Sequence, residues 1–210
     1  MSKKILLING SPRKSGLIGS MIAQFKSKIS ELNQAEGNVE IELLQLSDYK
    51  VEHCNGCDAC LRKPYSCPLS ENDDMPKIEE VMKSASAIII GAPSYFADMP
   101  GIVKDLIDRS RPMKMARYQL KDKFLSTITA SGLKDGGSSW VADSLIHWGL
   151  IQGMIVVGAL GHPVLEGNLP SESLQMNGLK EFRKPSEIGE ISQKTSSNLA
   201  ERLWNLVKSH

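Results

Sequence analysis

Short apolar runs recur along this chain, and stretches with helical periodicity separate them. The five runs cover residues 4–9, 39–44, 87–91, 124–129 and 154–158. Runs of this length are typical of strands buried in a parallel sheet. Apolar residues recur at helical spacing from Ile18 to Leu32, after Asp73, from Met99 to Ile107, from Ser138 to Leu150 and from Ile188 to Lys208. The alternation predicts right-handed βαβ crossovers and a three-layer α/β sandwich with helices on both faces of the sheet.

The length and composition fit one domain over residues 1–210, since 41% of the residues are hydrophobic and 23% are charged. Two segments are long for connections. One is a cysteine-rich loop at 47–73, and the other, at 161–187, is interpreted as a lid, a partner surface or a disordered segment. The net charge of +1 offers no broad basic surface for nucleic acid. No apolar run approaches the roughly 20 residues of a membrane span, and we expect a cytoplasmic protein.

The loop after the first predicted strand carries groups suited to a phosphate. It reads Gly10-Ser11-Pro12-Arg13-Lys14-Ser15-Gly16 and leads into a helix. Free amides at a helix N-terminus, two hydroxyls and an arginine together suit a monophosphate. The G-x-G-x-x-G fingerprint and the Walker A loop are both absent, which argues against an NTPase and an ordinary Rossmann dehydrogenase. A tight turn without a ligand is the alternative.

Two further loops follow predicted strands and are expected at the same edge of the sheet. Pro93-Ser94-Tyr95-Phe96 follows the run at 87–91, and a glycine-rich segment from Ser131 to Gly137 follows the run at 124–129. Aromatic rings offer flat surface, and glycines let backbone amides approach a planar ligand. Ligands of open α/β sheets bind beyond the carboxyl ends of the strands, so the three loops predict one crevice. Packing in a core or an interface is the alternative for both aromatic residues.

Three motifs together resemble one known family. They are Ile8-Asn9-Gly10-Ser11-Pro12-Arg13-Lys14, Gly91-Ala92-Pro93-Ser94-Tyr95-Phe96 with Met99 and Gly101, and Asp108-Arg109. The family is that of the flavodoxin-like NADPH-dependent FMN reductases, and the resemblance covers about Lys3 to Gly158. It implies strand order 2-1-3-4-5, non-covalent FMN, NAD(P)H as an electron donor and a homodimer or homotetramer.

The resemblance also implies which residues contact FMN. The phosphate is expected on Ser11, Arg13, Ser15, Gly16, Leu17 and Ile18. The isoalloxazine is expected against Pro93, Ser94, Tyr95, Phe96, Ser131, Gly132, Gly136 and Gly137. The family commonly has Asn-Thr where this chain has Leu17-Ile18. Ile18 can donate only its amide, so a hydroxyl must come from Ser11, Ser15 or Ser20.

All four cysteines lie in one short segment. Their pattern is Cys54-x2-Cys57-x2-Cys60-x6-Cys67. A compact run of this kind resembles ferredoxin-type ligation of a 4Fe–4S cluster more than zinc ligation, which usually pairs two separated knuckles. The pattern also narrows the resemblance to the iron–sulfur flavoproteins, where such a motif holds the cluster. Free or redox-active thiols and a zinc site remain the alternatives.

The features together predict an electron-transfer flavoprotein in which a cluster passes electrons between FMN and a carrier such as ferredoxin. A small-molecule acceptor is the alternative partner. One alternative is a cluster-free NAD(P)H-dependent FMN or quinone reductase. A second is a non-enzymatic flavin-binding or metal-binding interaction module. No catalytic side chain is identified, because flavin itself supplies the chemistry. Trp140 and Trp148 are expected in the core, and His147 and His162 are isolated.

Overall fold

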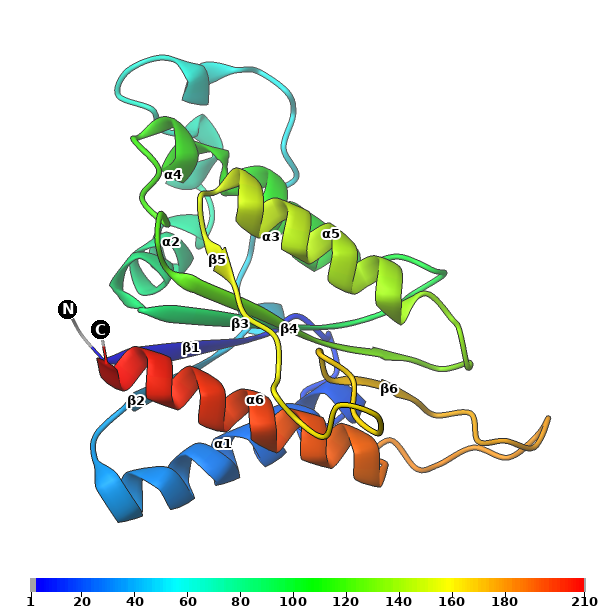
Figure 1. Ribbon diagram of the computed structural model, residues 1–210. Coiled ribbons are helices and arrows are strands. Elements are labelled where there is room, and N and C mark those ends of the chain that lie inside the picture. The colour runs from blue at the N-terminus through cyan, green and yellow to red at the C-terminus, as the bar shows by residue number, and fades with distance from the viewer. Residues whose placement is uncertain (1–2, 210) are drawn as a thin grey trace.

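A computed structural model describes residues 3–209, which form a parallel sheet between two layers of helices (Figure 1). The strands are β1 (Lys4–Asn9), β2 (Glu40–Gln45), β3 (Ala87–Pro93), β4 (Phe124–Ser131), β5 (Ile155–Val156) and β6 (Ser171–Ser173). Their order is β2-β1-β3-β4-β5, every pairing is parallel, and β6 pairs with β4. The predicted flavodoxin-like fold is confirmed.

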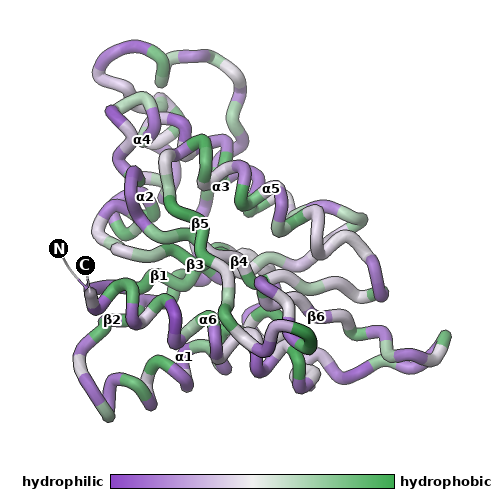
Figure 2. The backbone as a smooth tube through the Cα atoms, viewed as in Figure 1, coloured by the Kyte–Doolittle hydropathy of each residue, from purple (hydrophilic) through white to green (hydrophobic). Residues whose placement is uncertain are grey.

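Helices cover both faces of this sheet. They are α1 (Leu17–Glu36), α2 (Met75–Ser84), α3 (Gly101–Arg109), α4 (Arg111–Met115), α5 (Ser138–Ile151) and α6 (Glu190–Ser209). One core lies between the sheet, α1 and α6, and a second lies between the sheet, α2, α3 and α5. The hydrophobic colouring follows the central strands in Figure 2, as expected for a sheet buried on both sides. Within residues 3–209, no helix has both the length and the apolar composition needed to cross a bilayer.

One predicted strand and one predicted core side chain differ from the structure, and helix α4 and strand β6 were not predicted. The fifth strand was expected over 154–158, but β5 is limited to Ile155–Val156. After it the chain leaves the sheet, and β6 pairs with the far end of β4 in register with Thr129–Ser131. The short helix α4 and strand β6 have no clear local pattern.

The prediction that Trp140 lies in the core is wrong, because this side chain points outward from α5 and is 65% exposed.

Candidate functional site

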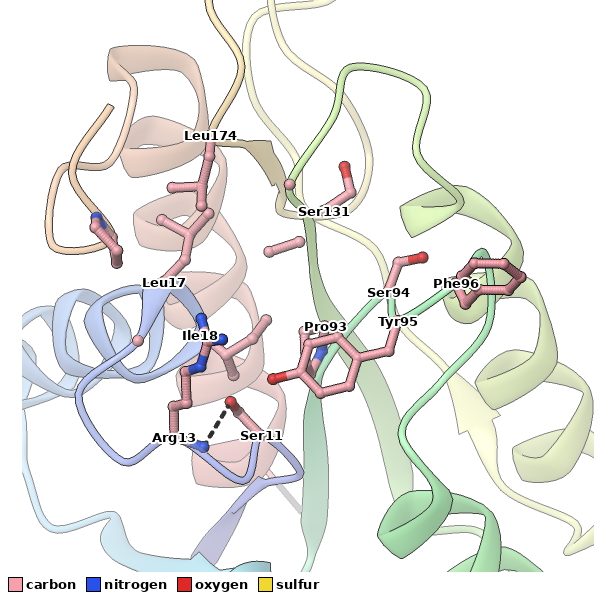
Figure 3. Close-up of a pocket in the computed structure, with 14 residues that line it drawn as sticks. Ser11, Arg13, Leu17, Ile18, Pro93, Ser94, Tyr95, Phe96, Ser131 and Leu174 are labelled. Carbon is pink, nitrogen blue, oxygen red and sulfur yellow. Dashed lines mark hydrogen bonds between the residues drawn. The ribbon is translucent and has the colours of Figure 1, made fainter. Parts of the chain in front are cut away.

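A pocket of about 340 Å³ lies where β1, β3 and β4 end (Figure 3). This volume is within the range of small-molecule sites. Three loops predicted to converge all contribute to it. The lining residues are Ser11, Arg13, Gly16, Leu17, Ile18, Pro93, Ser94, Tyr95, Phe96, Ala130, Ser131, Gly132, Leu174 and Pro185. The structure therefore brings together eleven of the fourteen residues predicted to bind the flavin; Ser15, Gly136 and Gly137 do not line the pocket.

Hydrogen bonds hold the loop between β1 and α1 in one shape. The Asn9 side chain accepts from the amide of Ser11 at 3.0 Å, and the Ser11 hydroxyl accepts from the amide of Arg13 at 3.1 Å. Gln45 on β2 bonds both to Asn9 and to the carbonyl of Ser11. Gly10 is required here, because a Cβ at this position would collide with the side chain of Val103. Contacts within the protein thus define the shape of this loop.

The polar end of the pocket has the groups that bind a monophosphate. Gly16 is the N-cap of α1 and provides no side-chain cap, so the first amides of the helix remain available to a ligand. Ser11, Arg13 and Gly16 line the pocket at this end. Ile18 is buried, so only its backbone can reach a phosphate, as expected from the sequence. The Lys14 ammonium pairs with Asp48 instead.

The loop after β3 supplies the aromatic wall of the pocket. In Figure 3 the Tyr95 ring extends toward Arg13 and Ile18, whereas Phe96 lies farther out and is fully exposed. A two-way backbone pairing between Tyr95 and Asp98 closes this turn. Tyr95 is therefore placed to contact a planar ligand.

Gly136 and Gly137 act behind the pocket rather than in its lining. The Ser94 hydroxyl donates to the Gly136 carbonyl at 2.6 Å. Gly137 has a φ of +92°, and a Cβ there would lie 2.7 Å from Cα of Ala97. The two glycines thus let the loops after β3 and β4 pack closely, which is a different role from the predicted contact with the isoalloxazine.

Leu174 and Pro185 belong to the segment 161–187 and were not predicted as site residues. Their segment reaches the pocket because β6 extends the sheet beside β4, and the amides of Leu174 and Gln175 then donate to the carbonyls of Ser131 and Gly132. Of the three interpretations offered for this segment, the lid agrees best with its place at the pocket. The only local sequence signal that could have indicated a strand reaching the pocket here is the alternation of apolar Leu174 and Met176 with polar neighbours.

The cysteine-rich loop forms a separate excursion beside α3 and α4 (Figure 1). All four thiols are free; Cys54 and Cys57 are exposed, and Cys60 and Cys67 are half-buried. Among the described residues 3–209, no group of three or more Cys, His, Asp or Glu side chains is placed to hold a metal ion. Burial raises the pKa of the Cys60 thiol, against the opposite influence of the nearby Arg111 guanidinium. None of the described residues 47–73 lines the pocket at the ends of β1, β3 and β4.

Arg109 anchors both ends of this excursion, a role that the sequence did not reveal. Its guanidinium is 1% exposed and donates to the carbonyl of Glu52, to the hydroxyl of Ser70 and to the Asp73 carboxylate, the last at 2.5 Å. Burial opposes ionisation of Asp73, but the hydrogen bonds from Arg109 and from backbone amides outweigh it and lower the pKa of this carboxyl. The cysteine loop is therefore tied to α3 by a buried ion pair.

Comparison with known proteins identifies the family. The sequence profile described as NADPH-dependent FMN reductase matches residues 3–162. An iron–sulfur flavoprotein of Archaeoglobus fulgidus is 36% identical over 207 residues, which cover 98% of this chain and 96% of that protein. An iron–sulfur flavoprotein of Methanosarcina thermophila is 33% identical over 163 residues, covering 76% of this chain and 79% of the relative.

A solved structure with the same fold is the flavoenzyme NAD(P)H:(acceptor) oxidoreductase of Paracoccus denitrificans. It superposes with a TM-score of 0.62 at 19% identity and covers 99% of this chain and 98% of its own. The sequence matches favour an enzyme over the non-enzymatic interaction module. The chain belongs to the NADPH-dependent FMN reductase family, groups there with the iron–sulfur flavoproteins, and is a flavin-dependent oxidoreductase.

Proposed function

We propose that this oxidoreductase binds FMN in the pocket at the ends of β1, β3 and β4, and exchanges electrons with a redox carrier through a 4Fe–4S cluster on the cysteine-rich loop. The observation that carries the proposal is the pocket, which joins an anion-binding loop to an aromatic wall. Bound FMN would supply the exchange between two-electron and one-electron steps. The names of the relatives support the cluster.

The pocket residues orient FMN and exclude water from one of its faces. Ser11, Arg13 and the first amides of α1 would hold the phosphate. Pro93 and Tyr95 would lie against the ring system on one side, and Ser131 and Gly132 would approach its edge. We assign the phosphate to the polar end of the lining because it is charged, and the ring system to the aromatic end because it is planar and largely apolar.

The cysteines are suited in kind to iron. Cys54, Cys57, Cys60 and Cys67 would hold the cluster, since four free thiols without a disulfide are the donor set that iron–sulfur clusters use. A bound cluster would supply one-electron transfer. Arg109 ties the ends of the loop to α3, so the excursion is anchored before any ligand binds.

The experiment that tests the function is anaerobic purification, followed by measurement of flavin, iron and acid-labile sulfide and by flavin reduction with NADH and NADPH. The proposed enzyme contains all three components and transfers electrons singly to a carrier. FMN without stoichiometric iron and sulfide, even after reconstitution, would point to the cluster-free FMN or quinone reductase. Zinc in place of iron would assign the cysteines to a zinc site. Absence of saturable FMN binding would refute the central proposal.

Replacing Arg13 with alanine should weaken FMN more than riboflavin, because only FMN has the phosphate with which a guanidinium can pair. A hydrogen bond to a charged group contributes about 1.5–3 kcal/mol, which corresponds to roughly 10- to 150-fold in affinity. The measurement is fluorescence quenching with each flavin. Lys14→Ala is the matched control, since Lys14 is in the same loop but pairs with Asp48 outside the lining. Equal losses of both flavins in Arg13→Ala would remove Arg13 from the phosphate site.

We also propose that the carrier is an acidic protein such as ferredoxin, and that it docks at the cysteine-rich loop. Exposed Arg62 and Lys63 lie on this loop, and α4, with Arg111 and Lys114, packs against its Ala59–Leu61 turn. Opposite charge increases the association rate and makes it depend on salt. Electron transfer to an acidic carrier should therefore slow as ionic strength rises. A rate without salt dependence would oppose this docking mode.

We further propose that the protein is cytoplasmic, as expected from the sequence. Four cysteines without a disulfide are typical of proteins in a reducing compartment.

A homodimer or homotetramer is part of the proposal. Trp140 and Ile151 on α5 and Ile155 on β5 are all exposed, by 65%, 56% and 45%. A second copy covering this apolar surface would remove it from water. It could also bring its cysteine-rich loop to this chain's flavin, which no described residue of 47–73 approaches within the pocket lining. A strictly monomeric mass by light scattering, with FMN bound and the protein fully active, would contradict the oligomer.

A further inference from the structure

One end of the pocket is lined by apolar side chains from two distant parts of the chain. Leu17 lies in the first turn of α1 and Leu174 follows β6; both line the pocket, and their side chains point toward each other in Figure 3. Leu174 packs against the core cluster that contains Leu17 and Ala130. The first turn of α1 is where the FMN phosphate is expected. Leu174 therefore stands immediately beyond the phosphate end.

Hydrogen bonds and an ion pair hold the segment that carries Leu174 and Pro185 in place. The amide of Leu174 donates to the Ser131 carbonyl at 3.1 Å, which continues the pairing of β6 with β4. Glu172 is 10% exposed and accepts from the Arg183 guanidinium at 2.8 Å and from the amide of Gly189 at 2.6 Å. This segment is thus held by β4 at Leu174 and by the Glu172 carboxylate at Arg183 and Gly189.

We propose that Leu174, with Pro185 at the rim, selects flavin mononucleotide over FAD. The inference rests on FMN binding in this pocket. Ser11, Arg13 and the α1 amides offer donors for one phosphate, whereas the next groups in FAD are a second charged phosphate and an adenosine. These groups would lie against the half-buried Leu174 side chain, which has no donor, so they would lose water on that side without gaining a hydrogen bond.

The cations of the same segment do not relieve this cost. Arg183 pairs through one of its nitrogens with Glu172, and none of Lys180, Arg183 and Lys184 is among the lining residues. A charge that loses water against an apolar side chain without gaining a hydrogen bond disfavours the ligand that carries it. The selectivity therefore depends on a residue of the 161–187 segment rather than on the phosphate loop alone.

The test is flavin exchange in the purified full-length protein. The protein is dialysed against an equimolar mixture of FMN and FAD, and the retained flavins are released and separated by chromatography. The wild type is expected to retain about 10-fold or more FMN than FAD. Leu174→Ala should lower this FMN:FAD ratio by about 5-fold or more, mainly because the variant retains more FAD. Leu179→Ala is the matched control, because Leu179 lies in the same segment but is 91% exposed and outside the lining. It should keep the wild-type ratio.

Three results would overturn the inference while leaving FMN binding intact. They are equal retention of FMN and FAD by the wild type, an unchanged ratio in Leu174→Ala, and equal loss of both flavins in that variant. A wild type that retains neither flavin would instead refute the proposed function. Should Leu174→Ala lose its native circular dichroism, Pro185→Ala carries the test by the same criteria, since Pro185 is exposed and its truncation spares the core.

Discussion

Replacing Cys57 with alanine is expected to remove most of the iron and acid-labile sulfide from anaerobically purified protein and to leave FMN bound. In the proposed cluster Cys57 is one of four thiol ligands, and loss of one would leave the cluster incompletely held. FMN stays because none of the described residues of the cysteine-rich loop lines its pocket. One-electron transfer to a carrier should then fall far more than two-electron reduction of the flavin. The measurements are iron, sulfide and flavin content and the two rates.

Ser66→Ala is the matched control, because Ser66 is an exposed residue of the same excursion that offers no thiol. This variant should retain the wild-type iron and sulfide. Loss of FMN together with iron in Cys57→Ala would show that the excursion supports the flavin site. Iron content equal to that of the wild type would remove Cys57 from the ligand set.

Replacing Arg109 with leucine should lower the free energy of unfolding near neutral pH by about 3–5 kcal/mol, because it leaves the buried Asp73 carboxylate without its partner. The Asp73 side chain is fully buried, and the Glu52 carbonyl and the Ser70 hydroxyl lose their donor as well. Urea unfolding measures the change. Arg111→Leu is the control: its pair with Asp58 is 43% and 55% exposed, and exposed pairs contribute about 0–1 kcal/mol. Equal losses in the two variants would contradict the anchoring role.

The same pair predicts how this stability depends on pH. Arg109 holds the folded-state pKa of Asp73 below its ordinary value, so the pair contributes stability above the unfolded pKa of about 4 and loses it as pH falls through the folded value. In Arg109→Leu the backbone amides of Glu52 and Met75 still donate to Asp73, but the guanidinium no longer opposes the burial that raises the pKa of this carboxyl. The gap in unfolding free energy between wild type and Arg109→Leu should therefore narrow below about pH 4. A constant gap would show that Asp73 is not the group involved.

The sequence by itself determined the layers of this protein and most of the lining of its candidate flavin pocket. Buried strands such as Ile5–Ile8 and Ile88–Ile90 are apolar at every position. Such a run predicts a strand buried on both faces, whatever its register with the neighbouring strands. Parallel strands also bring their carboxyl ends to one edge, so three loops far apart in sequence could be assigned to one crevice. Eleven predicted residues meet there for this reason.

The tertiary structure alone decided which segments complete and support that crevice. β6 pairs with β4 across about forty residues, and its three residues carry too little local pattern to predict such a partner. Arg109 belongs to a motif identified in the sequence, but its anchoring role depends on burial against Asp73, which only the folded chain shows. Gly136 and Gly137 were identified as important, but their contacts with Ser94 and Ala97 depend on how two loops pack. Periodicity records burial within one element, whereas these roles arise from contacts between elements, which only the folded chain brings together.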